Sequence, residues 1–256
     1  MEGEAFRLNM ILTLLILKKM IQFDLHVHTL FSQCGIHTAL EILARANEIG
    51  LKGIAITDHG PALPDERINS PFFERFKSPY PNLIFLKGME CNLVDANGTI
   101  DIPLRFKKCM DVVLLGIHPN TPMGLSAADY TNMLIAAIEK NPCVDIITHP
   151  NDPNYPVDYR RLAKAAKAAG VALELNNSKI LYARAETQSA VELVKACRDE
   201  GCKMAVNSDT HAIHELGLDE SVRPILESVG FPEEMIVNRD ERSTMEFIDS
   251  RRGNKM

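Results

Sequence analysis

Short apolar runs alternate with longer helical stretches along almost the whole chain, and this alternation limits the fold more than any other feature. The runs that predict strands are Phe23–Val27, Gly53–Thr57, Leu83–Leu86, Val112–Leu115, Val144–Thr148, Val171–Leu175 and Met204–Val206. The stretches that predict helices are Ala39–Ile49, Ala127–Lys140, Tyr159–Ala169, Thr187–Glu200 and Glu220–Val229. Strands that alternate with helices in this way are typical of βα units, which pair their strands in parallel.

Seven such strands favour a closed or nearly closed α/β barrel over two separate domains. An open, doubly wound sheet is the alternative arrangement. The nucleotide-binding form of that sheet carries a glycine-rich GxGxxG or GKS/T loop, and this sequence has neither. We therefore expect the barrel.

Composition excludes some classes of function. The chain of 256 residues has a formal net charge of −6, which does not favour binding of DNA or RNA through the phosphate backbone. Small phosphorylated substrates remain compatible with this charge, because bound metals supply positive charge locally. The six cysteines form no CxxC pair, so they resemble reduced thiols, and we expect a cytoplasmic protein.

The N-terminal segment carries an apolar run, Met10–Leu17. This run is much shorter than the roughly 20 residues that span a bilayer; Glu2 and Glu4 precede it and two lysines follow it, unlike the order of a signal peptide. We expect neither a membrane span nor a signal peptide. Residues 1–19 are predicted to be an extension, either a peripheral helix or a stretch upstream of a true start at Met20. Residues 20–256 are predicted to form one barrel domain.

Residues able to bind metals follow the end of nearly every predicted strand. They are His26 and His28, Asp58 and His59, Glu90, His118, His149, Asn176 and Asn177, and Ser208, Asp209 and His211. In a parallel barrel the carboxyl ends of the strands share one face, so these side chains are expected to converge there. Imidazole and carboxylate together suit Zn, Mn or Fe.

Each of these residues has an ordinary structural explanation when it is taken alone. A pair such as His26 and His28 is often incidental in a strand, and Asp58 with His59 could cap a helix. Their joint placement at the same end of the strands instead predicts a metal centre. The set is large enough for two or three divalent ions, and a carboxylate such as Glu90 can bridge two of them.

Seven motifs carry a resemblance to a known family. FDLHVHT, AITDHGP, KGMEC, LLGIHPN, IITHPNDP, LELNNS and NSDTH occur in the order and spacing of the PHP (polymerase and histidinol phosphatase) superfamily. Over roughly residues 20–250 the chain resembles the short stand-alone, phosphatase-like members. The resemblance implies a distorted (β/α)7 barrel with a trinuclear metal site at the carboxyl ends of the strands.

The resemblance also implies a set of metal ligands. They are His26, His28, Glu90 and Asp209 for the first metal, Glu90, His118 and His149 for the second, and His59 and His211 for the third. The family commonly has a further histidine where this chain has Cys34, and His37 follows three residues later. Either residue could complete the third site, and a thiolate would favour zinc. If neither reaches, the centre is effectively binuclear.

The implied activity is that of a metal-dependent phosphoesterase, most consistent with hydrolysis of a small phosphomonoester by a metal-bound hydroxide. Glu90, His149 and Asp209 are the expected catalytic residues. Arg184 is a candidate for gripping phosphate, although a solvated loop arginine is an equally ordinary explanation. Asn177 is a candidate for orienting ligands or substrate.

Three other functions remain open at this stage. A phosphodiesterase or exonuclease would use the same centre, and a non-catalytic barrel would bind metal without turnover. An amidohydrolase typically carries a lysine ligand at a strand end, for which Lys179 is poorly placed. The loop Pro61–Pro81 is expected to frame the mouth of the barrel and to set selectivity.

Overall fold

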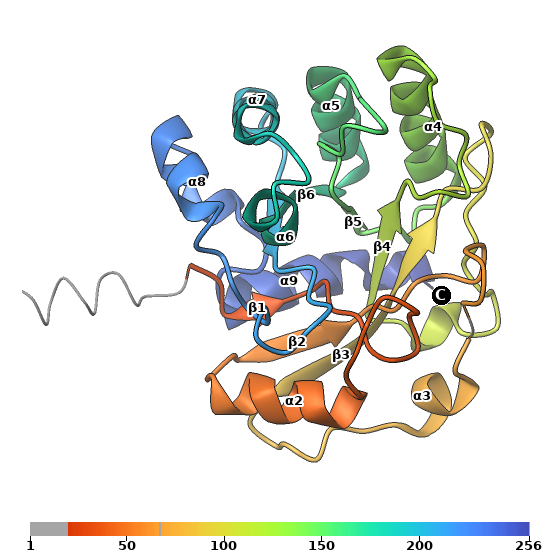
Figure 1. Ribbon diagram of the computed structural model, residues 1–256, viewed down its shortest axis with the longest axis vertical. Coiled ribbons are helices and arrows are strands. Elements are labelled where there is room, and N and C mark those ends of the chain that lie inside the picture. Colours follow the sequence, from red (N-terminus) through yellow and green to blue (C-terminus); the bar gives the residue numbers. More distant parts are fainter. Residues whose placement is uncertain (1–19, 67, 256) are drawn as a thin grey trace, which may run out of the picture.

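The computed structural model describes residues 20–66 and 68–255, and the apolar run Met10–Leu17 lies outside these ranges. Seven parallel strands form one sheet in the order of the sequence. They are β1 (Phe23–Asp24), β2 (Gly53–Ile56), β3 (Ile84–Asn92), β4 (Val112–Gly116), β5 (Ile146–Ile147), β6 (Ala172–Asn176) and β7 (Met204–Asn207). The predicted (β/α)7 barrel is confirmed, and Figure 1 shows the helices arranged around the strands.

The helices of the described ranges are α2 (Ala39–Glu48), α3 (Ser70–Arg75), α4 (Ala127–Lys140), α5 (Tyr159–Ala169), α6 (Asn177–Leu181), α7 (Thr187–Glu200), α8 (Arg223–Val229) and α9 (Glu241–Arg252). Short 3-10 turns lie at η1 (Lys107–Cys109), η2 (Glu233–Met235) and η3 (Gly253–Lys255). The bounds of α4, α5 and α7 agree with the prediction. In α8 the start is later than predicted, and Pro224 occupies the first turn, where a proline ring is tolerated.

Three helices were not predicted. Both α3, which lies within the predicted loop 61–81, and α6 are too short to display a helical period. Helix α9 is strongly polar and buries only a few of its side chains, among them Phe247 and Ile248. Its stability therefore depends on what it packs against rather than on its own pattern.

The barrel is closed between β1 and β7 partly by side chains. A parallel bridge joins Val27 to Thr210 near the carboxyl ends of the two strands. Further down, the buried Asn238 donates from Nδ2 to the carbonyl oxygens of Phe23 and Val206. This amide takes the place of strand pairing, which explains why the barrel is distorted at this seam.

Strand β1 is shorter than the predicted Phe23–Val27 for the same reason. The Leu25 N–H donates to Asn207 Oδ1 at 3.0 Å, and the Val27 N–H donates to Thr57 Oγ1 at 3.0 Å. Since side chains replace backbone acceptors here, the extended segment continues without a regular ladder of backbone hydrogen bonds.

Helix α9 covers the end of the barrel opposite the strand carboxyl ends. Phe247 and Ile248 pack with apolar residues at the starts of the strands, such as Phe23 and Val112. Arg251 also reaches the fully buried Asp145, and it donates to carbonyl oxygens at the start of β5. Apolar packing therefore closes the end of the barrel where the strands begin, and the polar residues gather at the carboxyl ends of the strands.

Within the described ranges, every helix is too short or too polar to cross a bilayer.

Candidate metal centre

One buried carboxylate lies at the middle of the predicted ligands. Glu90 extends from β3 and is 1% exposed. Its two oxygens face different imidazoles: Oε2 lies 3.2 Å from His26 Nε2, 3.5 Å from His28 Nε2 and 3.0 Å from His59 Nδ1, and Oε1 lies 3.3 Å from His118 Nε2 and 3.1 Å from His149 Nε2. A carboxylate in this position can join two groups of ligands.

The prediction that Glu90 follows strand β3 was wrong in its bounds, because β3 continues to Asn92. The predicted strand stopped at Leu86 since Lys87, Gly88 and Glu90 interrupt the apolar pattern. Lys87 instead donates to the Phe73 carbonyl, and Glu90 points into the centre. Polar residues are tolerated in this strand because each has a specific partner.

Asp209 supplies a second carboxylate after β7. Its Oδ1 lies 3.4 Å from His26 Nε2 and 3.3 Å from His28 Nε2. The Asp209 carbonyl accepts a hydrogen bond of 2.8 Å from His211 Nδ1. Because a carbonyl oxygen can only accept, His211 Nδ1 carries a proton, and in the neutral ring Nε2 keeps its lone pair. One residue thus orients one histidine through its backbone and faces two others through its side chain.

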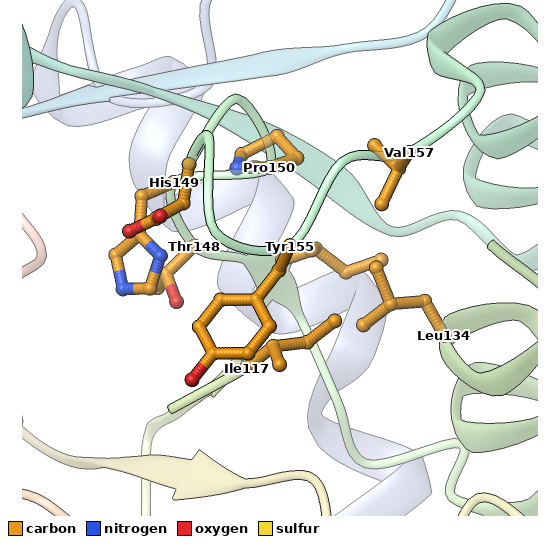
Figure 2. A pocket seen from close by; sticks show the side chains of 9 residues that line it. Ile117, Leu134, Thr148, His149, Pro150, Tyr155 and Val157 are labelled. Carbon is orange, nitrogen blue, oxygen red and sulfur yellow. The ribbon is translucent and has the colours of Figure 1, made fainter. Parts of the chain in front are cut away.

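Two of the expected catalytic residues have a left-handed backbone. His149 has φ 31° and Asp209 has φ 55°. Such a conformation costs free energy in a non-glycine residue, and it persists where the surroundings fix it, often at functional sites. His149 also lines a largely apolar hollow with Ile117, Leu134 and Val157, and Figure 2 shows it on the side opposite Leu134 and Val157. Its Nε2 lies 3.1 Å from Glu90 Oε1.

Sequence reasoning missed Glu174, a fully buried residue of β6. Its carboxylate accepts four hydrogen bonds, all donated by residues of the site or its lining: from His26 Nδ1 (2.8 Å), Asn207 Nδ2 (2.9 Å), the His149 N–H (2.8 Å) and Asn176 Nδ2 (2.9 Å). The signal was present in the alternation of LELNN, where Leu173 and Leu175 face outward and Glu174 and Asn176 inward.

The electrostatic field of the site is set by its carboxylates. Burial by itself would lower the pKa of His26, but Glu90, Glu174 and Asp209 together raise it well above its ordinary value. Burial would likewise raise the pKa of Glu90 and of Asp209, but the surrounding imidazoles lower both well below the usual range. The two carboxylates are therefore ionised at neutral pH, as metal ligands must be.

The other imidazoles differ among themselves. Burial lowers the pKa of His28 to about 3 and that of His118 to about 4, so both are neutral at pH 7. Burial would also lower the pKa of His59 and of His211, but their neighbours raise both. Glu90 raises the pKa of His59 to about 10, and Cys34 and Asp209 raise that of His211 to about 9. These two imidazoles occupy positions where a positive charge is favoured.

Several buried atoms of the site have no hydrogen-bond partner among the protein groups. They are His59 Nδ1, Glu90 Oε2 and both ring nitrogens of His118. Buried polar atoms without a partner are costly and need an explanation, such as an ion. Three groups of three donors also converge within 4.8 Å: His26, His28 and Asp209; His59, Glu90 and His118; and His28, Cys34 and His59. The residues present therefore fit divalent metals.

The structure separates the two residues that compete for the third site. Cys34 belongs to one of the three groups, with His28 and His59; burial would raise the pKa of its thiol, but the rings of His211 and His59 lower it. His37 lies outside all three groups, close to Glu41 at the start of α2. The Asp58 carboxylate accepts from the N–H and Oγ1 of Thr29, both at 2.7 Å, and the Asp58 carbonyl accepts from the Glu90 N–H at 3.0 Å.

The exposed Arg184 donates to Ser178 Oγ and stacks over the ring of Tyr182, which donates to Glu215. Glu215 in turn accepts the backbone N–H of His211 at 2.8 Å, and this connection places Arg184 on the His211 side.

Asn177, the other candidate, is 2% exposed, and its Oδ1 accepts from the Ser221 N–H at 3.0 Å. Its neighbour Asn176 contacts the ligand cluster instead, because Nδ2 of Asn176 donates to Asp209 Oδ2 at 3.1 Å.

Comparison with known proteins agrees with this geometry. A sequence model of the PHP domain matches residues 24–226, which carry all of the predicted ligands. The chain belongs to the PHP domain family. This PHP domain is 35% identical over 238 residues to a probable phosphatase of Proteus mirabilis, covering 90% of this chain and 95% of that protein. It is 34% identical over 237 residues to the probable phosphatase YcdX of Escherichia coli O81, with coverage of 91% and 96%.

A solved structure shares the fold. Histidinol phosphate phosphatase of Lactococcus lactis, in complex with zinc, L-histidinol and phosphate, aligns with a TM-score of 0.57 at 16% identity. The alignment covers 82% of this PHP domain and 94% of that chain. At this identity the likeness concerns the barrel alone.

Proposed function

We propose that this PHP domain is a metal-dependent hydrolase of small phosphomonoesters. The observation that carries the proposal is the position of Glu90, whose Oε1 and Oε2 face two different sets of imidazoles at 3.0–3.5 Å. That arrangement suits a carboxylate that bridges two cations. Two bound divalent metals would lower the pKa of water and neutralise charge on a phosphoryl group.

The protein groups hold and orient this centre. The ligands we propose are His26, His28, Glu90 and Asp209 on one side, Glu90, His118 and His149 on the other, and His59 and His211 beyond them. Glu174 fixes the tautomer of His26 by accepting from its Nδ1, so that Nε2 keeps the lone pair toward Glu90. Glu90, His149 and Asp209 are the residues we propose as catalytic, because they contact the region where the reacting groups would lie.

The substrate class is proposed from three lines of support. The relatives with high coverage are named as phosphatases, and the barrel resembles that of an enzyme solved with phosphate. Arg184 supplies a guanidinium on the His211 side, suited to a phosphoryl oxygen. Lys179 is paired with Asp152 at 2.5 Å rather than facing the ligands, and this pairing favours phosphoester over amide hydrolysis.

The main alternative is a phosphodiesterase or nuclease. The net charge of −6 favours a small ester over a nucleic acid, because a nucleic-acid site is normally rich in positive charge. All six cysteines are free thiols, and we propose a reducing compartment such as the cytoplasm.

The test is phosphate release from a panel of monoesters and diesters, with Mn²⁺, Zn²⁺ or Fe²⁺ added or with chelator. We expect monoester hydrolysis that chelator abolishes. His149→Ala should be inactive, and the matched variant His214→Ala should remain active, because His214 is 74% exposed and lies outside the metal centre. Thermal unfolding of both variants shows whether loss of activity reflects loss of fold. Cleavage of diesters alone, or metal-loaded protein without any cleavage, would overturn the proposal.

A further inference from the structure

The thiol of Cys34 lies among three imidazoles that come from different parts of the barrel. His28 follows β1, His59 follows β2 and His211 follows β7. The donor atoms of His28, Cys34 and His59 lie within 4.8 Å of one another. The His211 ring lies 4.7 Å from the His28 ring, and the rings of His211 and His59 lower the pKa of the Cys34 thiol against the effect of burial. Residues far apart in the sequence therefore meet at one sulfur atom.

The loop that carries Cys34 is built to hold this position. The Gly35 N–H donates to the Ser32 carbonyl at 3.0 Å, and the Ile36 N–H donates to the His211 carbonyl at 3.1 Å. A Cβ at residue 35 would lie 2.2 Å from the Thr29 carbonyl oxygen, so glycine is required there. The turn is thus tied to the backbone on both sides of the cysteine.

Ser32 connects the same turn to two of the histidines. Its Oγ accepts from the His59 N–H at 2.9 Å and lies 3.2 Å from His28 Nδ1. Because these contacts engage Nδ1 of His28 and the backbone of His59, they leave other nitrogens of the two rings for ligation. The loop, the serine and the histidines form one connected unit around the thiol.

We propose that Cys34 is a thiolate ligand that, with His59 and His211, makes one subsite of this metal centre selective for zinc over manganese. The inference rests on the proposed function only in assuming that the centre binds divalent metals. Binding of the cation displaces the thiol proton to solvent and forms one S–metal bond. Thiolate and imidazole suit Zn²⁺, whereas Mn²⁺ prefers oxygen ligands.

His37, the competing residue, is not part of this subsite. Its carbonyl accepts from the Leu30 N–H at 2.8 Å, which holds the backbone in the turn. Its ring interacts electrostatically with Glu41 of α2 and contributes to lowering the pKa of that carboxyl. Among the described residues, Cys34 is the one cysteine of the six that belongs to any of the three ligand groups. Cys109 is exposed like Cys34 but lies outside these groups, so it serves as a matched control.

The first test uses Co²⁺ as the probe. Chelator-treated protein is titrated with Co²⁺, and the near-ultraviolet thiolate-to-cobalt charge-transfer absorption is recorded together with bound metal per chain. We expect the absorption in the wild type, Cys109→Ser and His37→Ala, and its loss in Cys34→Ser. Cys34→His should keep the bound metal but lose the absorption. Its preference for Zn²⁺ over Mn²⁺, measured as the ratio of the two affinities, should fall by at least about tenfold, because loss of even an indirect partner of a ligand has an effect of that size.

A second test needs no variant and therefore no assumption about folding. Alkylation of the wild type is followed by mass spectrometry at Cys34 and Cys109. Zn²⁺ should slow modification of Cys34 strongly, Mn²⁺ should slow it much less, and Cys109 should react equally in all samples. Metal binding and phosphatase activity without a charge-transfer band, or without protection of Cys34, would overturn this inference and leave the proposed function standing. Phosphatase inactivity with the band present would overturn the function and leave the thiolate ligand.

Discussion

The Glu174 carboxylate lies 2.8 Å from His26 Nδ1, on the opposite side of the imidazole from the nitrogen that faces Glu90. The four groups that Glu174 contacts are all donors, so its lone pairs are fully used. A carboxylate behind a ligating histidine fixes its tautomer and orientation. Glu174 thus fixes how His26 presents its Nε2 to Glu90.

Glu174→Gln should weaken metal binding by roughly 10–100-fold, the usual effect of losing such a partner. Glutamine keeps the size of the side chain, but its amide places two N–H groups against donors. Titration of chelator-treated protein with Zn²⁺ and Mn²⁺ measures the change. Glu139→Gln, an exposed substitution on α4, is the control and should bind metal like the wild type. Equal metal affinity in the two variants would show that Glu174 does not support metal binding.

Arg184→Ala should raise KM for the phosphomonoester by roughly tenfold with little change in kcat, because a charge-assisted hydrogen bond to phosphate is then lost before the chemical step. Arg184→Lys should recover only part of the loss, since lysine cannot bind two phosphate oxygens in a planar fork. Steady-state kinetics and inhibition by inorganic phosphate provide the measurement. Arg160→Ala, on the exposed face of α5, is the control. A fall in kcat at constant KM would argue against this role.

The stability of the metal-free protein should be greatest near pH 6.5, the ordinary pKa of histidine. His28 and His118 have lowered pKa values of about 3 and about 4, so the unfolded chain binds more protons below pH 6.5 and stability falls on acidification. His59 and His211 have raised values of about 10 and about 9. The folded chain binds more protons above pH 6.5, and stability falls again as pH rises through those values.

Urea unfolding of chelator-treated protein across this range tests the prediction. Each group contributes a slope of up to about 1.4 kcal/mol per pH unit. His118→Asn should flatten the acidic side of the profile, and His211→Asn the alkaline side. Profiles that neither variant alters would show that other groups govern the pH dependence.

Arg251→Met should lower the free energy of unfolding by about 3–5 kcal/mol, the typical cost of breaking a buried ion pair from one side. The guanidinium lies 3.3 Å from Asp145 Oδ1, and Asp145 is fully buried. Its loss leaves that carboxylate with Lys255 as its remaining cation, at 2.7 Å. The neighbouring Arg252→Met should change stability by no more than about 0.5 kcal/mol, because Arg252 is exposed. Urea unfolding measures the stability of both variants, and equal effects would show that the buried ion pair of Arg251 with Asp145 does not stabilise the fold.

Much of the architecture could be predicted from local patterns. The apolar runs and amphipathic stretches gave the order of seven strands, and α4, α5 and α7 have the predicted bounds. Helix α9 could not be found in this way, because its polar sequence becomes helical only against the end of the barrel. The bounds of β3 were missed since the polar residues that interrupt its pattern find partners only in the folded chain.

The sequence by itself determined which residues could bind metals, because their chemistry and their place after each strand are local properties. The tertiary structure alone decided how they meet. It places both oxygens of Glu90 among five imidazoles, puts Glu174 behind His26, and brings Cys34 rather than His37 to His59 and His211. These choices depend on barrel closure and loop geometry, which arise from contacts between residues far apart in the chain. No local pattern encodes such distances.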